Sequence, residues 1–223
     1  MLNIFVGFDP REAVAYHVFC QSVLEKSSVP VAFTPLVLSA LAEDYIEAHK
    51  DGSNAFIYSR FLVPYLMGYK GWAIFADGDM VCNSDIAELY ELRDDSKAVM
   101  VVKHDYATKF PVKYLSNKNE DYPCKNWSSL MLWNCGHEAN RILTPGYVES
   151  VTHGGALHRF LHLEPNQIGQ LPMTWNWLVE EYPFKNDCKL FHYTIGTPCF
   201  RNYIACDNAK LWHEAFKNVC HPL

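Results

Sequence analysis

The sequence has no uninterrupted apolar run of roughly 18 residues, the length that a helix needs to cross a bilayer, so we expect no membrane span. It also has no run of lysines and arginines, and its formal net charge is −6. Proteins that hold nucleic acid electrostatically carry the opposite balance, so we expect no nucleic-acid partner. The amino terminus reaches Asp9 and Pro10 too early for a signal peptide, which predicts a cytoplasmic protein.

The eight cysteines include no C-x-x-C pair, and several of them lie inside apolar runs. This pattern favours buried free thiols over a disulfide framework. The sequence also lacks internal repeats, linkers, low-complexity segments and a Walker A phosphate-binding motif. What remains is a chain of 223 residues, 49% of them hydrophobic, which can bury one sizeable core.

Apolar segments typical of strands alternate with segments typical of helices along the chain. We expect strands at 2–7, 30–38, 71–76, 98–102, 128–133 and 189–193. We expect helices at 11–26, 58–67, 85–92 and 209–217, and a short helix that begins at Thr144-Pro145. This alternation predicts one α/β domain.

The strand at 71–76 ends in Asp77-Gly78-Asp79. Ligands of α/β sheets bind beyond the carboxyl ends of the strands, and the glycine lets both carboxylates face one point. Two carboxylates held close repel each other, and a divalent cation relieves that repulsion. A solvated Asp-Gly turn is the alternative, but the position directly after a buried strand favours a metal site.

Four segments together resemble the GT-A fold glycosyltransferases of the glycogenin and bacterial galactosyltransferase group, usually called family 8. They are VGFDPREAVAYHV, YSRFLVPYL, FADGDMV and LFHYTIGTPCF. The resemblance covers nearly the whole chain, and KNWSSLMLWN and LPMTWNWL are similar to segments of small bacterial or viral members of unassigned substrate. It implies one Rossmann-like domain with a mixed, mainly parallel sheet, a nucleotide-binding half at 1–104 and an acceptor-side half at 105–223.

The resemblance also implies roles for single residues. Asp77, Asp79 and His192 would hold a manganese or magnesium ion against the diphosphate of a nucleotide sugar. Asp9, in the turn after the first strand, would accept the imino hydrogen of a uracil, which implies a uridine diphosphate sugar. The donor-binding residues implied in this way are Gly7, Phe8, Asp9, Arg60, Asp77, Gly78, Gly196 and Thr197.

For catalysis the resemblance points to Arg60, as a fixed cation, and to Glu164, which matches the first acid of the family's D-Q-D segment. The rest of that segment departs from the family, since Pro165 and Asn166 follow. The segment after Gly196 also lacks the lysine that usually reaches a phosphate. We expect a retaining transfer in which a donor phosphate oxygen takes the acceptor proton; an inverting enzyme would need Glu164 or Asp105 as its base.

Some polar residues leave two interpretations open. The short polar residues that border apolar runs suit turn chemistry and sugar binding about equally well; they are Asn126, Ser128, Ser129 and Asn176. His158 and His162 have helical spacing with Arg159 between them, which favours a solvated helix face over a metal site.

The sequence as a whole thus predicts a metal-dependent hexosyltransferase that moves a sugar from a nucleotide donor to a glycan, lipid-linked or protein acceptor. The alternative is a nucleotide-sugar-binding or carbohydrate-binding protein without turnover. The sequence makes no prediction of oligomeric state.

Overall fold

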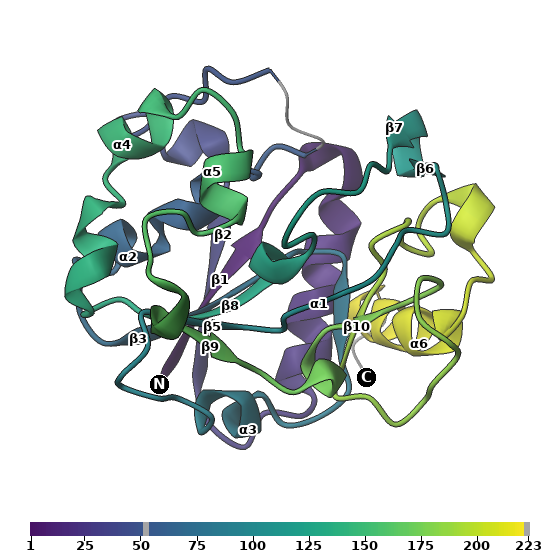
Figure 1. Ribbon diagram of the computed structural model, residues 1–223. Helices are drawn as coiled ribbons and strands as arrows, with labels where there is room; N and C mark the ends of the chain where they lie inside the picture. Colours follow the sequence, from purple (N-terminus) through teal and green to yellow (C-terminus); the bar gives the residue numbers. More distant parts are fainter. Residues whose placement is uncertain (51–53, 221–223) are drawn as a thin grey trace.

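The computed structural model describes residues 1–50 and 54–220, and its centre is a six-stranded sheet in the order β2-β1-β3-β8-β5-β9 (Figure 1). Its strands are β1 (Leu2–Gly7), β2 (Val31–Leu36), β3 (Trp72–Ala76), β5 (Val99–Val101), β8 (Leu130–Asn134) and β9 (Ile168–Gln170). Only β8 runs antiparallel to its neighbours β3 and β5, whereas the other pairs are parallel. The predicted mixed, mainly parallel sheet is therefore confirmed.

Two smaller sheets flank the main one. A three-stranded sheet joins β10 (Trp177–Leu178), β11 (Leu190–His192) and β4 (Met80–Cys82), with β11 antiparallel to β4. A short hairpin pairs β6 (Val112–Lys113) with β7 (Asn117–Lys118). β4 was not predicted from the sequence. It has three residues and begins directly after Asp79, so it is too short to be distinguished from the end of the Asp-Gly-Asp turn.

The helices are mostly short. They are α1 (Ala13–Leu24), α2 (Val63–Leu66), α3 (Ile86–Tyr90), α4 (Pro145–Ser150), α5 (Gly155–His158) and α6 (Ala209–Cys220). The predicted helix at 58–67 is a 3-10 turn followed by the single turn of α2. The Thr144 side chain caps α4 as expected, by accepting a hydrogen bond from the backbone N–H of Tyr147.

Short 3-10 segments supply most of the remaining turns. They are η1 (Pro10–Glu12), η2 (Leu38–Ala40), η3 (Ser59–Leu62), η4 (Tyr114–Ser116), η5 (Trp127–Ser129), η6 (Glu138–Ile142), η7 (Pro165–Gln167), η8 (Met173–Trp175) and η9 (Arg201–Tyr203).

Alternate residues of the main strands face two separate cores. Phe5 and Phe75 pack with residues of α2, α4 and α5 on one face of the sheet, whereas Ile4 and Ile74 pack with α1 and α3 on the other. A third cluster joins α1 and β4 to α6. Figure 1 shows α2, α4 and α5 gathered on the opposite side of the molecule from α6. These layers leave the carboxyl ends of β1 and β3 free to carry polar residues.

No helix within residues 1–50 and 54–220 is both long and apolar enough to cross a membrane. All eight cysteines are free, as expected. Cys82, Cys135 and Cys188 are buried, but Cys199 and Cys220 are exposed, so the prediction that the thiols are buried is wrong for these two.

The ends of β1 and β3 approach each other closely because both carry a glycine. A Cβ atom on Gly78 would lie 2.6 Å from the carbonyl oxygen of Gly7, and a Cβ atom on Gly7 would lie 2.3 Å from the Phe56 ring. Any larger residue at Gly78 would therefore push against rigid backbone and separate the two strand ends.

We expect Gly78→Ala to lower the free energy of unfolding by about 1–3 kcal/mol, because the added methyl group meets backbone that cannot move aside. Gly146→Ala is the matched control, since a Cβ atom there, inside α4, meets nothing within 4 Å. It should be neutral or stabilising by up to about 1 kcal/mol. Urea unfolding of both variants measures the difference, and equal effects would contradict the close approach.

Candidate active site

Asp77, Asp79 and His192 meet where the main sheet ends and the three-stranded sheet begins. Asp77 follows β3, Asp79 precedes β4, and His192 ends β11 opposite Met80 of β4. Their relative exposures are 7%, 9% and 1%. One ligand atom from each side chain lies within 4.8 Å of the others. The geometry thus gathers two carboxylates and one imidazole around one point.

A chain of hydrogen bonds behind His192 fixes the orientation of its ring. Ser129 Oγ donates to the Asn126 carbonyl (2.7 Å) and accepts from Asn176 Nδ2 (2.8 Å). The oxygen of the Asn176 amide, Oδ1, can only accept a hydrogen bond. His192 Nδ1, 3.0 Å away, therefore carries a hydrogen and donates it to Asn176 Oδ1. The Nε2 atom of His192 is left to face the site.

The atom that His192 Nε2 faces is Asp79 Oδ1, at 3.2 Å. Their geometry is not that of a hydrogen bond, and within the described chain Asp79 Oδ1 has no hydrogen-bond partner although it is buried. Burial acts to raise the pKa of Asp79, but the His192 imidazole holds that pKa below its ordinary value. Two electron-rich atoms can face each other at this distance only if a proton or a cation lies between them.

Arg60 holds the other carboxylate. Its Nη1 atom donates to Asp77 Oδ1 (2.7 Å) and to the Ser128 carbonyl (3.0 Å). The guanidinium lies between the Phe56 and Phe75 rings, 5.0 and 5.1 Å from their centroids. Burial raises the pKa of Asp77 to about 6, and Arg60 opposes that rise. Arg60 is therefore a buried cation that orients Asp77, as well as a neighbour of any bound anion.

Lys113, on β6, lines the same cavity as the three metal-ligand candidates. Its ammonium makes no hydrogen bond or ion pair within the described residues, and its one ring contact is with Tyr114, at 6.0 Å. Burial lowers the pKa of Lys113, while Asp79 and Asp77 act against that shift. Lys113 was not predicted from the sequence, because a lysine in a polar loop is usually solvated.

Similarity to known sequences shows the family to which the chain belongs. The pattern of glycosyl transferase family 8 matches residues 14–214. The chain belongs to glycosyl transferase family 8. It is 44% identical over 219 residues to the protein CDI of Arabidopsis thaliana, an alignment that covers 94% of this chain and 84% of that protein.

Solved structures share the fold of this family 8 protein. The galactosyltransferase LgtC, solved with donor and acceptor sugar analogs, superposes with a TM-score of 0.60 at 10% identity, over 100% of this chain and 98% of LgtC. Mouse xyloside xylosyltransferase 1 gives 0.57 at 13% identity over 86% and 97%. The bifunctional glycosyltransferase WbbM gives 0.67 at 13% identity over 97% of this chain, which spans only 50% of WbbM. The chain is thus a glycosyltransferase with the GT-A fold.

The first-strand turn of this glycosyltransferase borders a second cavity, of about 320 Å³. Arg11 Nε and Nη2 donate to Asp9 (2.9 and 2.6 Å), and the Ala55 N–H donates to it as well (3.1 Å). Phe8 packs edge-to-face on Tyr16, with ring centroids 5.8 Å apart. Asp9 therefore lines the second cavity, but its oxygens already accept hydrogen bonds from Arg11 and from the Ala55 N–H.

Gly196 and Thr197 lie outside the cavity that holds the metal-ligand candidates. The Gly196 N–H donates to the Tyr193 carbonyl (2.9 Å), and a Cβ atom on Gly196 would lie 2.4 Å from the Tyr203 ring. Thr197 is fully buried beside Cys199. The glycine is needed here for packing against Tyr203, and Thr194 is the residue of this segment that reaches the cavity.

The structure does not bring Glu164 to the site. Glu164 is exposed and caps η7, just before β9. Because β9 pairs in parallel with β5, this segment lies at the amino end of the sheet, opposite the end that carries Asp77. Asp105 is also exposed and does not line the cavity. The prediction that either acid serves as the catalytic carboxylate is therefore corrected.

His158 lies in the site although the sequence predicted a solvated helix face. It is 8% exposed, its ring packs edge-to-face on Phe61, and its Nδ1 atom lies 2.6 Å from Ser128 Oγ. Helical spacing is a poor guide here because α5 is a single turn inserted between larger elements. Of the polar residues with two interpretations, Asn126, Ser128 and Ser129 line the cavity, and Asn176 orients His192.

Glu12 is a buried carboxyl group that the sequence did not single out. It is 7% exposed, its carboxyl is hydrogen-bonded to Tyr114, and its Oε2 atom has no partner within the described chain. Burial, followed by the charge of Asp79, raises the pKa of Glu12 from its ordinary 4.5 to about 8. Glu12 is therefore neutral at neutral pH in the folded protein.

This pKa predicts how stability changes with pH. Between 4.5 and about 8 the folded protein keeps the Glu12 proton that the unfolded chain releases, so the free energy of unfolding falls as pH rises through that window. Glu12→Gln removes this dependence. The free energy of unfolding of the variant minus that of wild type should therefore rise with pH, by at most about 1.4 kcal/mol per pH unit. Urea unfolding at about pH 5 and pH 8 with EDTA measures the change. A parallel profile, like that expected of the exposed control Glu43→Gln, would refute it.

Proposed function

We propose that this glycosyltransferase moves a hexose from a uridine diphosphate sugar to a saccharide, lipid-linked or protein acceptor, with manganese or magnesium bound and with retention of configuration, in the cytoplasm. The observation that carries the proposal is the convergence of Asp77, Asp79 and His192 at the carboxyl end of β3. The nucleotide-sugar donor follows from family membership, whereas the metal and the stereochemistry rest on the site.

The residues fit a divalent ion. The unpartnered Asp79 Oδ1 atom and the His192 Nε2 atom point at one place, and Asp77 adds a second carboxylate. Mixed carboxylate and imidazole ligands suit manganese and magnesium better than they suit a soft ion. Such an ion, when bound, neutralises charge that develops on the departing diphosphate.

The chain's own cations would act on the same charge. Lys113 lines the cavity and has no carboxylate partner among residues 1–50 and 54–220, so its ammonium is available to a phosphate group. Arg60 is held by Asp77 and contributes a fixed positive charge within the site. Because both groups are largely removed from water, their attraction for a developing anion is stronger than it would be at the surface.

The nucleoside would occupy the cavity beside Asp9. That cavity shares Asn54 and Ile57 with the metal cavity, so one ligand can extend from one to the other. Asp9 lies at its wall with Arg11, and recognition of a uracil would require Asp9 to exchange one of its present donors for the base. The uridine assignment rests on the family resemblance of this turn.

The acids around the site favour retention. The metal cavity is lined by two carboxylates, Asp77 and Asp79, and both are assigned to the ion. An inverting transfer needs a further carboxylate base beside the acceptor, and neither Glu164 nor Asp105 lines this cavity. Glu120 lines the adjoining cavity, but its carboxylate is exposed and paired with Lys118 (3.4 Å), which makes it a poor base. A donor phosphate oxygen is then the base nearest to the reaction.

The metal assignment predicts the behaviour of two variants. Asp79→Asn should abolish manganese-dependent binding of uridine diphosphate, because it replaces a charged carboxylate ligand with a neutral amide. Asn176→Ala should weaken the manganese affinity about 10–100-fold, since it frees the His192 ring to turn. Calorimetric titration of manganese in the presence of uridine diphosphate measures both.

Asp187→Asn, which changes an exposed carboxylate far from the cavity, is the control. If Asp79→Asn retains the affinity of that control, the three residues are not a metal site. Binding of uridine diphosphate sugars without any donor hydrolysis by the wild type would instead favour a protein that binds without turnover.

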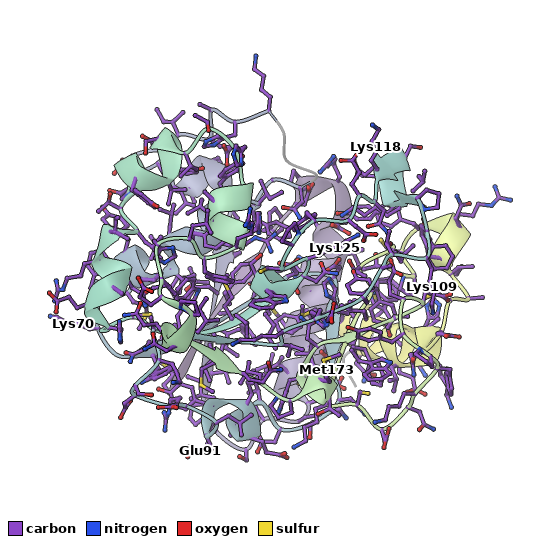
Figure 2. All side chains as sticks on the ribbon, viewed as in Figure 1. Lys70, Glu91, Lys109, Lys118, Lys125 and Met173 are labelled. Atoms are coloured by element: carbon purple, nitrogen blue, oxygen red, sulfur yellow. The ribbon has the colours of Figure 1, made fainter. Side chains whose placement is uncertain are left out.

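Lys113 can be tested separately from the metal. We expect Lys113→Met to weaken uridine diphosphate binding about tenfold or more while uridine binding changes little, because the ammonium meets only the phosphates. Lys70→Met is the control, since Lys70 is exposed at the far edge of the molecule (Figure 2). Equal weakening of uridine and uridine diphosphate would show that Lys113 supports the fold rather than the phosphate site.

A further inference from the structure

A third cavity, of about 410 Å³, adjoins the metal cavity on the side away from Asp9. It lies between the β6–β7 hairpin, the segment at 119–126 and α5. The two cavities share Lys113, Tyr122 and His158 among their lining residues. A molecule in this third cavity would therefore reach the same place as a donor held by the metal site.

The walls of this cavity are basic. Among the described residues, Glu120 is the one carboxylate that lines it. The cationic side chains described there are Lys113, Lys118, Lys125 and Arg159. This is unusual for a chain with 25 acidic and 19 basic residues. Lys125 is buried (8% exposed), whereas Lys118 is exposed and lies at the edge of the view in Figure 2, so the basic residues include both buried and exposed side chains.

Not all of these charges are neutralised by the protein. Lys118 pairs with Glu120 (3.4 Å), and Lys125 pairs with Asp121 (3.6 Å) and donates to Asn119 Oδ1 (2.8 Å). Arg159 is exposed and has no carboxylate partner in the described part of the chain. Its guanidinium can form two parallel hydrogen bonds with a phosphate or a carboxylate.

We propose that the third cavity is the acceptor subsite of this enzyme and that the acceptor carries an anionic group, a phosphate or a carboxylate, which Arg159 binds. The inference rests on the proposed function, since it takes the metal cavity as the donor site. The charge of the donor does not require Lys118, Lys125 or Arg159. The metal-ligand candidates, Arg60 and Lys113 already line the metal cavity, where the diphosphate would bind. Tyr122, 45% exposed at the cavity wall, offers a ring face to the sugar of the acceptor.

The test uses the full chain with manganese and uridine diphosphate present. Calorimetry would compare saccharides that differ only in the group at C6: glucose, glucose 6-phosphate and glucuronic acid, then the same three forms of galactose. We expect at least one charged form to bind about tenfold more tightly than its neutral counterpart, as a charge-assisted hydrogen bond would give. Preference for the phosphate or the uronic acid tells which anion the cavity selects.

Arg159→Met should remove most of this preference. Arg141→Met is the matched control, because Arg141 is an exposed arginine that lines neither cavity. Raising the salt concentration should narrow the difference between charged and neutral saccharides in wild type and leave Arg159→Met nearly unaffected.

Three results would overturn the proposal. They are equal affinity for charged and neutral saccharides, no detectable binding of any charged saccharide, and a preference that Arg159→Met leaves intact. Failure of the proposed function is distinguishable from these, since it would appear as the absence of manganese-dependent donor hydrolysis in wild type before any acceptor is added.

Discussion

The burial of two carboxylates at one strand end is the constraint on which the rest of this site depends. Removing an ionised carboxylate from water is costly unless opposite charge or hydrogen-bond donors replace the water. Arg60 fills this role for Asp77. Asp79 Oδ1 faces His192 Nε2 at 3.2 Å and has no hydrogen-bond partner among the described residues. The strongly raised pKa of Glu12 shows that the same region does not hold a further negative charge. The cation that we propose at this place would supply the positive charge that Asp79 lacks.

The position of the carboxylates follows from a change of sheet. β3 belongs to the main sheet, Gly78 turns the chain against Gly7, and β4 enters the three-stranded sheet with β11. Because β11 pairs with β4, His192 is brought beside Asp79 although more than a hundred residues separate them in sequence. A sheet that continued in one plane would have placed the two aspartates on a simple turn and the histidine elsewhere.

Features that depend on residues close together in the chain were predicted from the sequence. The apolar run of β3 and its terminal carboxylates are visible in sequence because a buried strand has a continuous hydrophobic signal. The sequence left Asn176 open between turn chemistry and sugar binding and did not single out Lys113, because the positions of both side chains depend on the pairing of distant strands. Glu164 was misplaced for a related reason: a resemblance in a short acidic segment says nothing of which end of β9 that segment occupies.

The three cavities form a continuous series, and their order suggests how the reaction is organised. Ile57 lines all three, so the segment before η3 forms a common wall from the Asp9 side to the Arg159 side. The metal cavity in the middle is lined by groups of both charges, whereas most of the charged residues described at the outer cavity beside α5 are cations. An acceptor anion would be attracted to that outer wall and away from the aspartates. Its free hydroxyl groups would then be the part that faces the centre, where the donor sugar has to be.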